Sequence, residues 1–127
     1  MLRAHHLAVV VRDLDASERF YCGVLGLPIL QRWQTPEGHP RSIWVSLGDA
    51  SFLAIERASA AAPKRADEAP GLHCLAFAIH RSERESYRAR LTAAGHPIER
   101  ETRFTLYTRD PDGALIGLSH HPDATPE

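Results

Sequence analysis

An internal repeat constrains the fold of this chain more than any other feature. Residues 6–29 read HLAVVVRDLDASERFYCGVLGLPI, and residues 73–98 read HCLAFAIHRSERESYRARLTAAGHPI. Each segment begins with a histidine, passes through an apolar strand into a polar stretch with a helix-start signal, and ends in Gly-x-Pro-Ile. A repeat of this kind indicates that one supersecondary unit occurs twice along the chain.

The same helix signals follow the first strand of each half. A strand rich in β-branched residues is predicted at 5–11. Asp15 with Glu18 in the first half, and Ser82 with Glu85 in the second, have the spacing of a capping box. Apolar residues at helical spacing follow both caps, and a glycine that suits a helix stop follows each helix. These glycines are Gly26 and Gly95.

Short strands are predicted after each helix. Gly48-Asp49 and Asp110-Pro111-Asp112-Gly113 are turn signals between pairs of these strands. Neither half is large enough to bury its own sheet, so we expect an α+β fold in which two tandem βαβββ modules form a cupped mixed sheet around a cleft, with the helices outside. The expected strands are 29–33, 42–47 and 52–57 in the first half and 97–101, 104–108 and 114–119 in the second.

The length and the connector define the domain organisation. The 127 residues suit one compact domain. Residues 58–71, ASAAAPKRADEAPG, are rich in alanine and proline and carry several charges, so we interpret them as a linker. Module 1 is then about 1–57 and module 2 about 72–121, within a single domain over 1–127.

Composition excludes several classes of function. The net charge is −1 with neutral histidines, so there is no basic surface for nucleic acid. Residues 1–15 contain an apolar run of only five residues, too short for a signal peptide or a membrane span. Cys22 and Cys74 stand alone, which fits a reducing compartment. We therefore expect a cytoplasmic protein whose partner is a small molecule, not a nucleic acid or a membrane.

Side-chain alternation along the strands brings three candidate metal ligands to one face. The larger apolar residues of the first strand suit packing on the helix, which leaves His6 on the opposite face. The repeat predicts the same for His73, and Glu56 lies opposite the apolar face of its strand. Two imidazoles and a carboxylate suit Fe, Mn, Ni, Co or Zn. The alternative is that each histidine is a solvated strand end and that Glu56 faces water.

The whole chain resembles the vicinal oxygen chelate superfamily, which includes glyoxalases, bleomycin-resistance proteins and extradiol dioxygenases. The residues that carry the resemblance are His6-Leu-Ala-Val-Val-Val-Arg-Asp13-Leu14, Phe20-Tyr21, Leu25-Gly26-Leu27, His73 and Asp110-Pro111-Asp112-Gly113. The resemblance implies paired βαβββ modules around a divalent metal and a substrate that chelates the metal through adjacent oxygens. It also implies a homodimer, since small members commonly share modules between two chains.

Carried over by position, the resemblance assigns ligand roles and reveals a departure. His6, Glu56 and His73 match three family ligands, whereas the glutamate expected in Asp-Pro-Asp-Gly-x-x-apolar-Glu is Gly117. In one outcome the three remaining ligands hold a metal with open positions, giving a lyase, isomerase or oxygenase that acts on a vicinal-oxygen substrate. In the other outcome the metal is lost and the cleft sequesters a small molecule, as in proteins of the bleomycin-resistance type.

Further residues are candidates for the cleft. Tyr107 matches a tyrosine of fosfomycin-resistance enzymes and could donate a proton in catalysis, although an ordinary strand tyrosine would look the same. Trp44 could form an aromatic pocket wall, with core packing as the alternative. Ser119 shares a strand face with Gly117, which would itself enlarge the pocket.

The residues at the two ends of the second module also have predicted roles. His120 or His121 could turn back to replace the missing ligand, since both follow the last strand closely. Cys74 is expected to be a buried structural thiol that points away from the face of His73.

Overall fold

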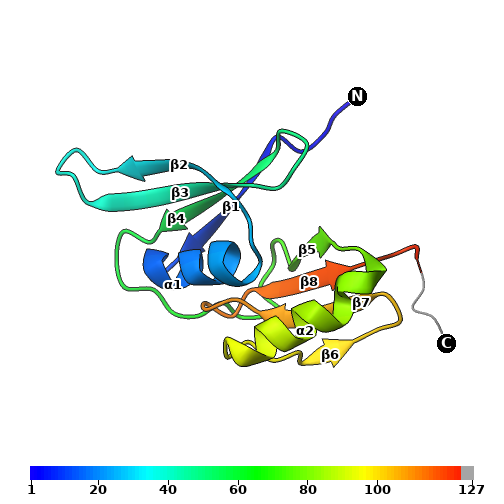
Figure 1. Ribbon diagram of the computed structural model, residues 1–127. Coiled ribbons are helices and arrows are strands. Elements are labelled where there is room, and N and C mark those ends of the chain that lie inside the picture. The colour runs from blue at the N-terminus through cyan, green and yellow to red at the C-terminus, as the bar shows by residue number, and fades with distance from the viewer. Residues whose placement is uncertain (124–127) are drawn as a thin grey trace. The chain divides into compact units, whose positions relative to one another are not determined.

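The computed structural model describes residues 1–123 and separates into two compact units, Met1–Pro63 and Lys64 onward (Figure 1). Each unit contains one four-stranded mixed sheet and its own helix. The predicted α+β class, with the βαβββ order occurring twice, is confirmed. No helix within residues 1–123 is both long enough and apolar enough to cross a bilayer.

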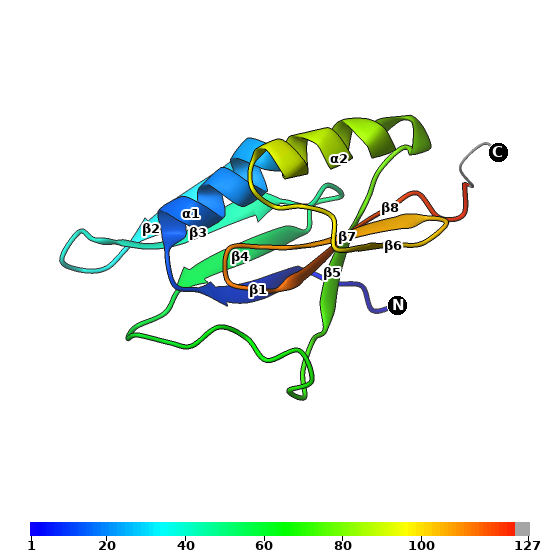
Figure 2. The same cartoon turned by 90° about the horizontal axis from the view of Figure 1, so that it is seen from below.

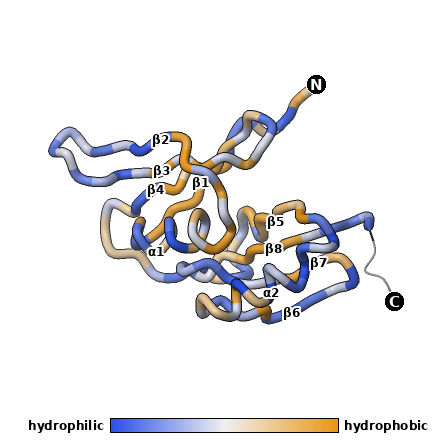
Figure 3. The backbone as a smooth tube through the Cα atoms, viewed as in Figure 1, coloured by the Kyte–Doolittle hydropathy of each residue, from blue (hydrophilic) through white to orange (hydrophobic). Residues whose placement is uncertain are grey.

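The first unit forms a sheet in the order β1-β4-β3-β2, in which β1 runs parallel to β4. In Figure 2 helix α1 lies over one face of this sheet, and it packs on β3 and β4. Figure 3 shows that the far end of the β2–β3 hairpin is hydrophilic. The elements are β1 (His6–Val11), α1 (Leu14–Glu18), a π-helical turn (Arg19–Val24), β2 (Ile29–Gln34), β3 (Pro40–Ser46) and β4 (Phe52–Arg57).

Helix α1 begins two residues earlier than the sequence predicts. Of the two aspartates that suit a helix cap, Asp13 is the N-cap and Asp15 is not: the Asp13 carboxylate accepts hydrogen bonds from the backbone N–H groups of Asp15 at 2.9 Å and Ala16 at 3.2 Å. Such a cap contributes about 1 kcal/mol. The predicted stop at Gly26 is confirmed, since its φ of 79° is the left-handed conformation that glycine adopts without strain.

The core of the first unit lies between α1 and the sheet. Phe20 and Tyr21 follow α1 in the π-helical turn, are fully buried, and meet edge to face with ring centroids 4.9 Å apart. The helix-facing side chains of the sheet are equally inaccessible. They are Val11, Ile43, Val45, Leu53 and Ile55.

The second unit repeats this topology with the order β5-β8-β7-β6 and a parallel β5–β8 pair. Strand β6 is much shorter than the predicted strand 97–101, and the boundaries of β7 and β8 lie within one residue of the prediction. The elements are β5 (Cys74–Ala78), a 3-10 turn (Arg81–Glu83), α2 (Arg84–Ala93), β6 (Arg100–Glu101), β7 (Thr105–Arg109) and β8 (Leu115–Ser119).

The 3-10 turn that leads into α2 is capped by a histidine, and the predicted Ser82 is not the cap. The His80 side chain accepts from the backbone N–H of Ser82, while the Glu83 carboxylate accepts from the backbone N–H of His80 at 2.8 Å. Helix α2 then buries Leu91 and Arg84, and Gly95 ends it as predicted. Thr108 donates to the carbonyl oxygens of residues 96 and 97 just after α2, so this residue faces the helix side of its sheet.

The turn Asp110-Pro111-Asp112-Gly113 joins β7 to β8 as predicted. The buried Asp110 carboxylate accepts from the backbone N–H groups of Asp112 at 2.9 Å and Ala114 at 2.8 Å. Gly113 has a φ of 87°, which a side chain would strain. The turn thereby fixes the start of β8.

The connector between β4 and β5 has no helix or strand, in keeping with the predicted linker. Its Asp67 carboxylate accepts two hydrogen bonds from the Arg109 guanidinium, the shorter at 2.6 Å. Arg109 also binds Glu99 at 2.8 Å, and these hydrogen bonds lower the pKa of the Glu99 carboxyl. Arg109 therefore fixes the part of the connector around Asp67 to β7 of the second unit.

Candidate ligand-binding faces

In the first unit, the sheet face away from α1 carries a row of aromatic rings. Phe52 stacks on His6 with ring centroids 4.9 Å apart and planes 7° from parallel, and on Trp44 at 4.4 Å and 25°. Trp33 extends the row, with its centroid 5.2 Å from that of Trp44. The row crosses the sheet diagonally from β1 through β4 and β3 to β2.

Polar groups lie beside this aromatic row. Trp44 shares its strand face with Ser42 and Ser46, as the sequence predicts from alternation. Ser42 is buried, and its hydroxyl has no hydrogen-bond partner among the described residues. Its cross-strand neighbours are Trp33 and Glu56. A buried hydroxyl without a partner is uncommon, and it is a group that a bound molecule can satisfy.

The register separates two of the three predicted metal ligands. His6 pairs with Phe52, whereas Glu56 pairs with Val10, four residues further along the parallel strands. At the rise of a β-strand this offset is about 13 Å, while two donors to one ion lie about 3 Å apart. The His6 ring is also held by Phe52 and by Nδ1 of His5 at 2.8 Å. The first unit therefore does not bring His6 and Glu56 together.

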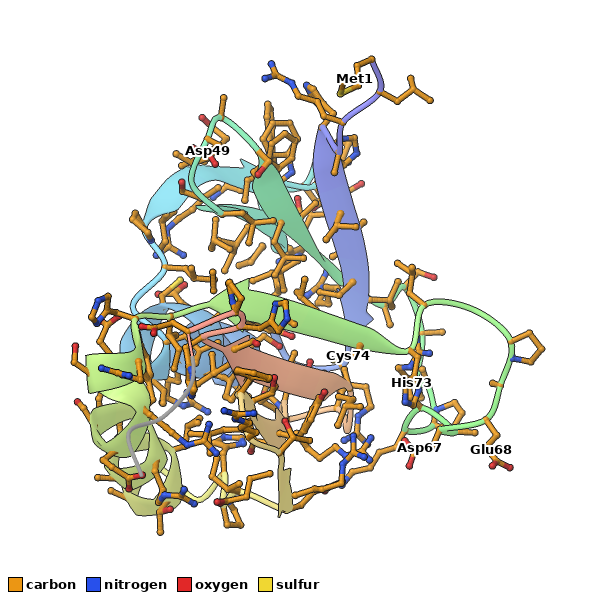
Figure 4. The ribbon with its side chains drawn as sticks, turned by 90° about the vertical axis from the view of Figure 1, so that its right-hand side faces the viewer. Met1, Asp49, Asp67, Glu68, His73 and Cys74 are labelled. Atoms are coloured by element: carbon orange, nitrogen blue, oxygen red, sulfur yellow. The ribbon has the colours of Figure 1, made fainter. Side chains whose placement is uncertain are left out.

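In the second unit, Cys74 takes the place that the sequence repeat assigns to His73. Cys74 is the first residue of β5 and pairs with Leu115 on β8, as His6 is the first residue of β1 and pairs with Phe52 on β4. His73 precedes the strand at its junction with the connector and is exposed (Figure 4). The repeat as read from the sequence is thus shifted by one residue against the structure.

The environment of Cys74 differs from the prediction of a buried structural thiol. The residue is exposed and lies on the sheet face away from α2, together with Ala76 and Gly117. Partial desolvation by the surrounding protein raises the pKa of its thiol, against opposing effects of the Gly117 backbone and of Arg100 and Arg109. Both Cys22 and Cys74 are free thiols.

Gly117 does not leave an empty space in β8. A Cβ atom at this buried position would lie 3.2 Å from Cβ of Ala76, 3.3 Å from Cγ2 of Thr105 and 3.4 Å from Cε1 of Tyr107. Neighbouring side chains therefore lie against the glycine, and its place in a pocket stays a prediction. Ser119 is on the same face, as predicted, and its hydroxyl accepts a hydrogen bond from Thr105 at 2.9 Å.

His120 does not replace the missing ligand. The buried ring lies on the side of α2, where its Nε2 is 2.8 Å from a guanidinium nitrogen of Arg84. Its Nδ1 hydrogen-bonds to the backbone carbonyl of Asp123, so the proton is on Nδ1 and Nε2 accepts from Arg84. His120 thus serves the core of the second unit.

The internal symmetry of the two sheets identifies the counterpart of Gly117. Gly117 pairs with Ala76, two residues beyond Cys74, and Ala54 pairs with Ala8, two residues beyond His6. The counterpart of the family glutamate in the first unit is therefore Ala54, not Glu56. Of the four corresponding positions, His6, Ala54, Cys74 and Gly117, two have no donor in their side chains.

These residues do not fit a resident metal of the family type. Within residues 1–123 there is no group of three His, Cys, Asp or Glu side chains arranged to hold an ion. The two positions that would supply carboxylates carry alanine and glycine, and neighbours fill the space beside the glycine.

The fold and the two sheet faces define the class of protein, paired βαβββ modules with open sheet faces, and the comparisons give the family. The model of the Glyoxalase/Bleomycin resistance protein/Dioxygenase superfamily matches residues 3–118. The chain belongs to this superfamily, which confirms the resemblance seen in the sequence. No curated protein matches the sequence.

Solved structures of the superfamily share the fold. A glyoxalase family protein from Enterococcus faecalis is 27% identical with a TM-score of 0.74, covering 92% of this chain and 96% of that one. A glyoxalase/dioxygenase from Nostoc punctiforme is 22% identical with a TM-score of 0.77, covering 98% and 92%. A mutant of the Listeria monocytogenes fosfomycin resistance protein FosX, complexed with Mn(II) and 1S,2S-dihydroxypropylphosphonic acid, is 19% identical with a TM-score of 0.72, covering 92% and 90%.

Sequence reasoning missed several residues of these faces. Phe52, which joins His6 to Trp44 in the aromatic row, lies in the predicted strand 52–57 opposite its apolar face, and this alternation was the available signal. Arg100 is another such residue, and it lies within the predicted strand 97–101. Its position depends on the pairing of Arg100 with Tyr107, which no local pattern reveals.

Proposed function

We propose that this protein binds a small planar molecule without a resident metal, as a binding or sequestering member of its superfamily. The observation that carries the proposal is the row of His6, Phe52, Trp44 and Trp33 on an open sheet face. Stacked rings offer a flat, apolar and polarizable surface, which favours a planar ring system as ligand.

A metal-dependent enzyme is the second candidate. The FosX structure, complexed with Mn(II), supports it by similarity of fold, and His6 on the open face of the first unit supports it within this chain. Bound metal would supply a Lewis acid for a vicinal-oxygen substrate. The positions of Ala54 and Gly117 favour the metal-free reading, and Tyr107 as a catalytic proton donor stays a prediction. So do the homodimer and the cytoplasmic location.

Trp44→Ala should weaken binding of a planar ligand roughly ten- to hundredfold, because it removes the central ring of the stacking surface. Suitable probes are metal-free bleomycin, which the superfamily name suggests, and quinoxaline as a simple planar ring. The chain contains two tryptophans, both in the row, so quenching of tryptophan fluorescence reports binding at this face. Trp33 keeps the signal available in the variant.

The matched control is Tyr87→Ala, which removes an aromatic ring from α2 in the other unit. It should leave the dissociation constant unchanged. The proposal is wrong if neither probe quenches the fluorescence, or if the two variants weaken binding equally. Circular dichroism establishes that both variants are folded.

Metal should be dispensable for stability and binding. A metal at a hundred times its dissociation constant would stabilise the fold by about 2.7 kcal/mol, which is a shift of several degrees for a chain of this size. We expect that EDTA, or added Fe(II), Mn, Ni, Co or Zn, shifts the melting temperature by less than about one degree on that scale. His73→Ala should not change probe affinity. A copurifying ion whose removal lowers the melting temperature by several degrees would instead establish the metal-dependent reading.

A further inference from the structure

On the sheet face away from α2, three residues lie next to one another in space: Gly117, Tyr107 and Arg100. Tyr107 pairs with Gly117 across β7 and β8, and with Arg100 across β6 and β7. The edge of the Tyr107 ring faces Gly117: its Cε1 atom lies 3.4 Å from the position that a Cβ atom of residue 117 would occupy. The Arg100 guanidinium lies over the same ring, 4.5 Å from its centroid. Glycine thus allows the tyrosine to lie on β8, and the tyrosine positions the arginine.

The charge of Arg100 is not neutralised within the described part of the chain. Arg109 is bound to Glu99 and Asp67, and Glu101 is occupied by Arg88 at 2.6 Å. The Arg100 guanidinium lies over the Tyr107 ring, and it has no ion pair with any residue in 1–123. The Tyr107 hydroxyl likewise has no hydrogen-bond partner in that range. A guanidinium stacked on a ring keeps its N–H edges available for a planar, bidentate acceptor.

We propose that Arg100 and Tyr107 form a binding site for an oxyanion, a carboxylate or a phosphate-type group, with Gly117 as the residue that positions them. The guanidinium edge donates two hydrogen bonds to the anion, and the phenol hydroxyl donates a third. Glu99, the neighbouring carboxylate, forms its ion pair with Arg109 at 2.8 Å and acts on Arg100 only by weaker attraction through space.

The preference of the site for an anion follows from the absence of the family glutamate at position 117. At position 117 the family pattern has a glutamate that serves a cation, and such a carboxylate would repel an anionic ligand and displace the Tyr107 ring. With glycine there, the local negative charge is absent and a fixed guanidinium supplies the positive charge. The inference rests on the proposed function only in taking the ligand to be a small molecule.

The test uses the full ¹⁵N-labelled chain, titrated with inorganic phosphate, methylphosphonate, benzoate and acetate at constant ionic strength. Arg100→Gln should weaken the preferred anion roughly ten- to hundredfold, because it removes the charge-assisted hydrogen bonds. Tyr107→Phe and Gly117→Ala should weaken it severalfold, and Arg100→Lys should retain part of the affinity. The relative affinities of the four anions distinguish a carboxylate site from a phosphate site.

The matched control is Arg90→Gln, because Arg90 lies over the Tyr87 ring on α2 in a similar stack, 5.0 Å from its centroid. It should leave both the affinity and the melting temperature unchanged, and Arg100→Gln should leave the melting temperature unchanged. The site is refuted if no anion gives saturable shifts around residues 100, 107 and 117, or if Arg100→Gln and Arg90→Gln behave alike. Tryptophan quenching in the first unit tests the proposed function separately, so the two can fail independently.

Discussion

Gly117→Glu is expected to destabilise the protein by about 2–3 kcal/mol, because the larger side chain overpacks a position that its neighbours already fill. Its Cβ alone would be 3.2–3.4 Å from Ala76, Thr105 and Tyr107, and the nearest of these atoms, Cβ of Ala76, is fixed by the backbone. The rest of the glutamate must pass beneath or beside the Tyr107 ring. Restoring the family residue should therefore cost stability without creating a metal site.

Thermal unfolding with and without divalent ions measures this effect. Gly23→Ala is the matched control, because a Cβ at Gly23 has no atom within 4 Å and the position lies in a helical turn. That variant should be neutral or slightly stabilising. The prediction is wrong if Gly117→Glu has the same melting temperature as the unmodified protein and Mn(II) or Zn(II) raises it by several degrees. Position 117 could then supply a metal ligand.

The fold could be predicted from the sequence because its signals are local. Alternation along the strands, Gly26 and Gly95 as helix stops, and the turn beginning at Asp110 each follow from a few neighbouring residues, and each is confirmed. The helix caps were misplaced for the same reason. Several acceptors stand close together in each segment, and the choice of Asp13 and His80 depends on how the strand enters the helix.

The positions of the predicted metal ligands could not be predicted to the same degree, because they depend on the register between paired strands. His6 and His73 both stand seven residues before their helix caps, Asp13 and His80, so the sequence repeat pairs them. The span from the first residue of the strand to the cap is one residue shorter in the second unit, so Cys74 takes the strand position of His6. A one-residue slip exchanges the two faces of a strand.

Glu56 illustrates the second limit of local reasoning. Its face was predicted from alternation, but its distance from His6 depends on the pairing of two strands that are far apart in the sequence. The same pairing makes Ala54 the counterpart of Gly117. The strand face of a residue does not determine its register with the neighbouring strand. A metal site requires ligands that share a face and also lie close together in register.

Arg84→Ala is expected to destabilise the second unit by about 3 kcal/mol, because it leaves buried acceptors unpaired. The guanidinium of this buried arginine donates to Nε2 of His120 at 2.8 Å and to the carbonyl of Thr102 at 2.9 Å. Both acceptors would lose this donor in a part of the fold with little access to water. The melting temperature should fall by roughly 10 °C.

Arg90→Ala on the same helix is the control for the loss of an arginine from α2. Arg90 lies on the outer part of the helix over Tyr87, and an exposed substitution of this kind should change stability by less than about 0.5 kcal/mol. Urea unfolding monitored by circular dichroism gives both values. Equal stability of the two variants would mean that the Arg84–His120 contact does not stabilise the packing of His120 against α2, and that the burial of His120 has another cause.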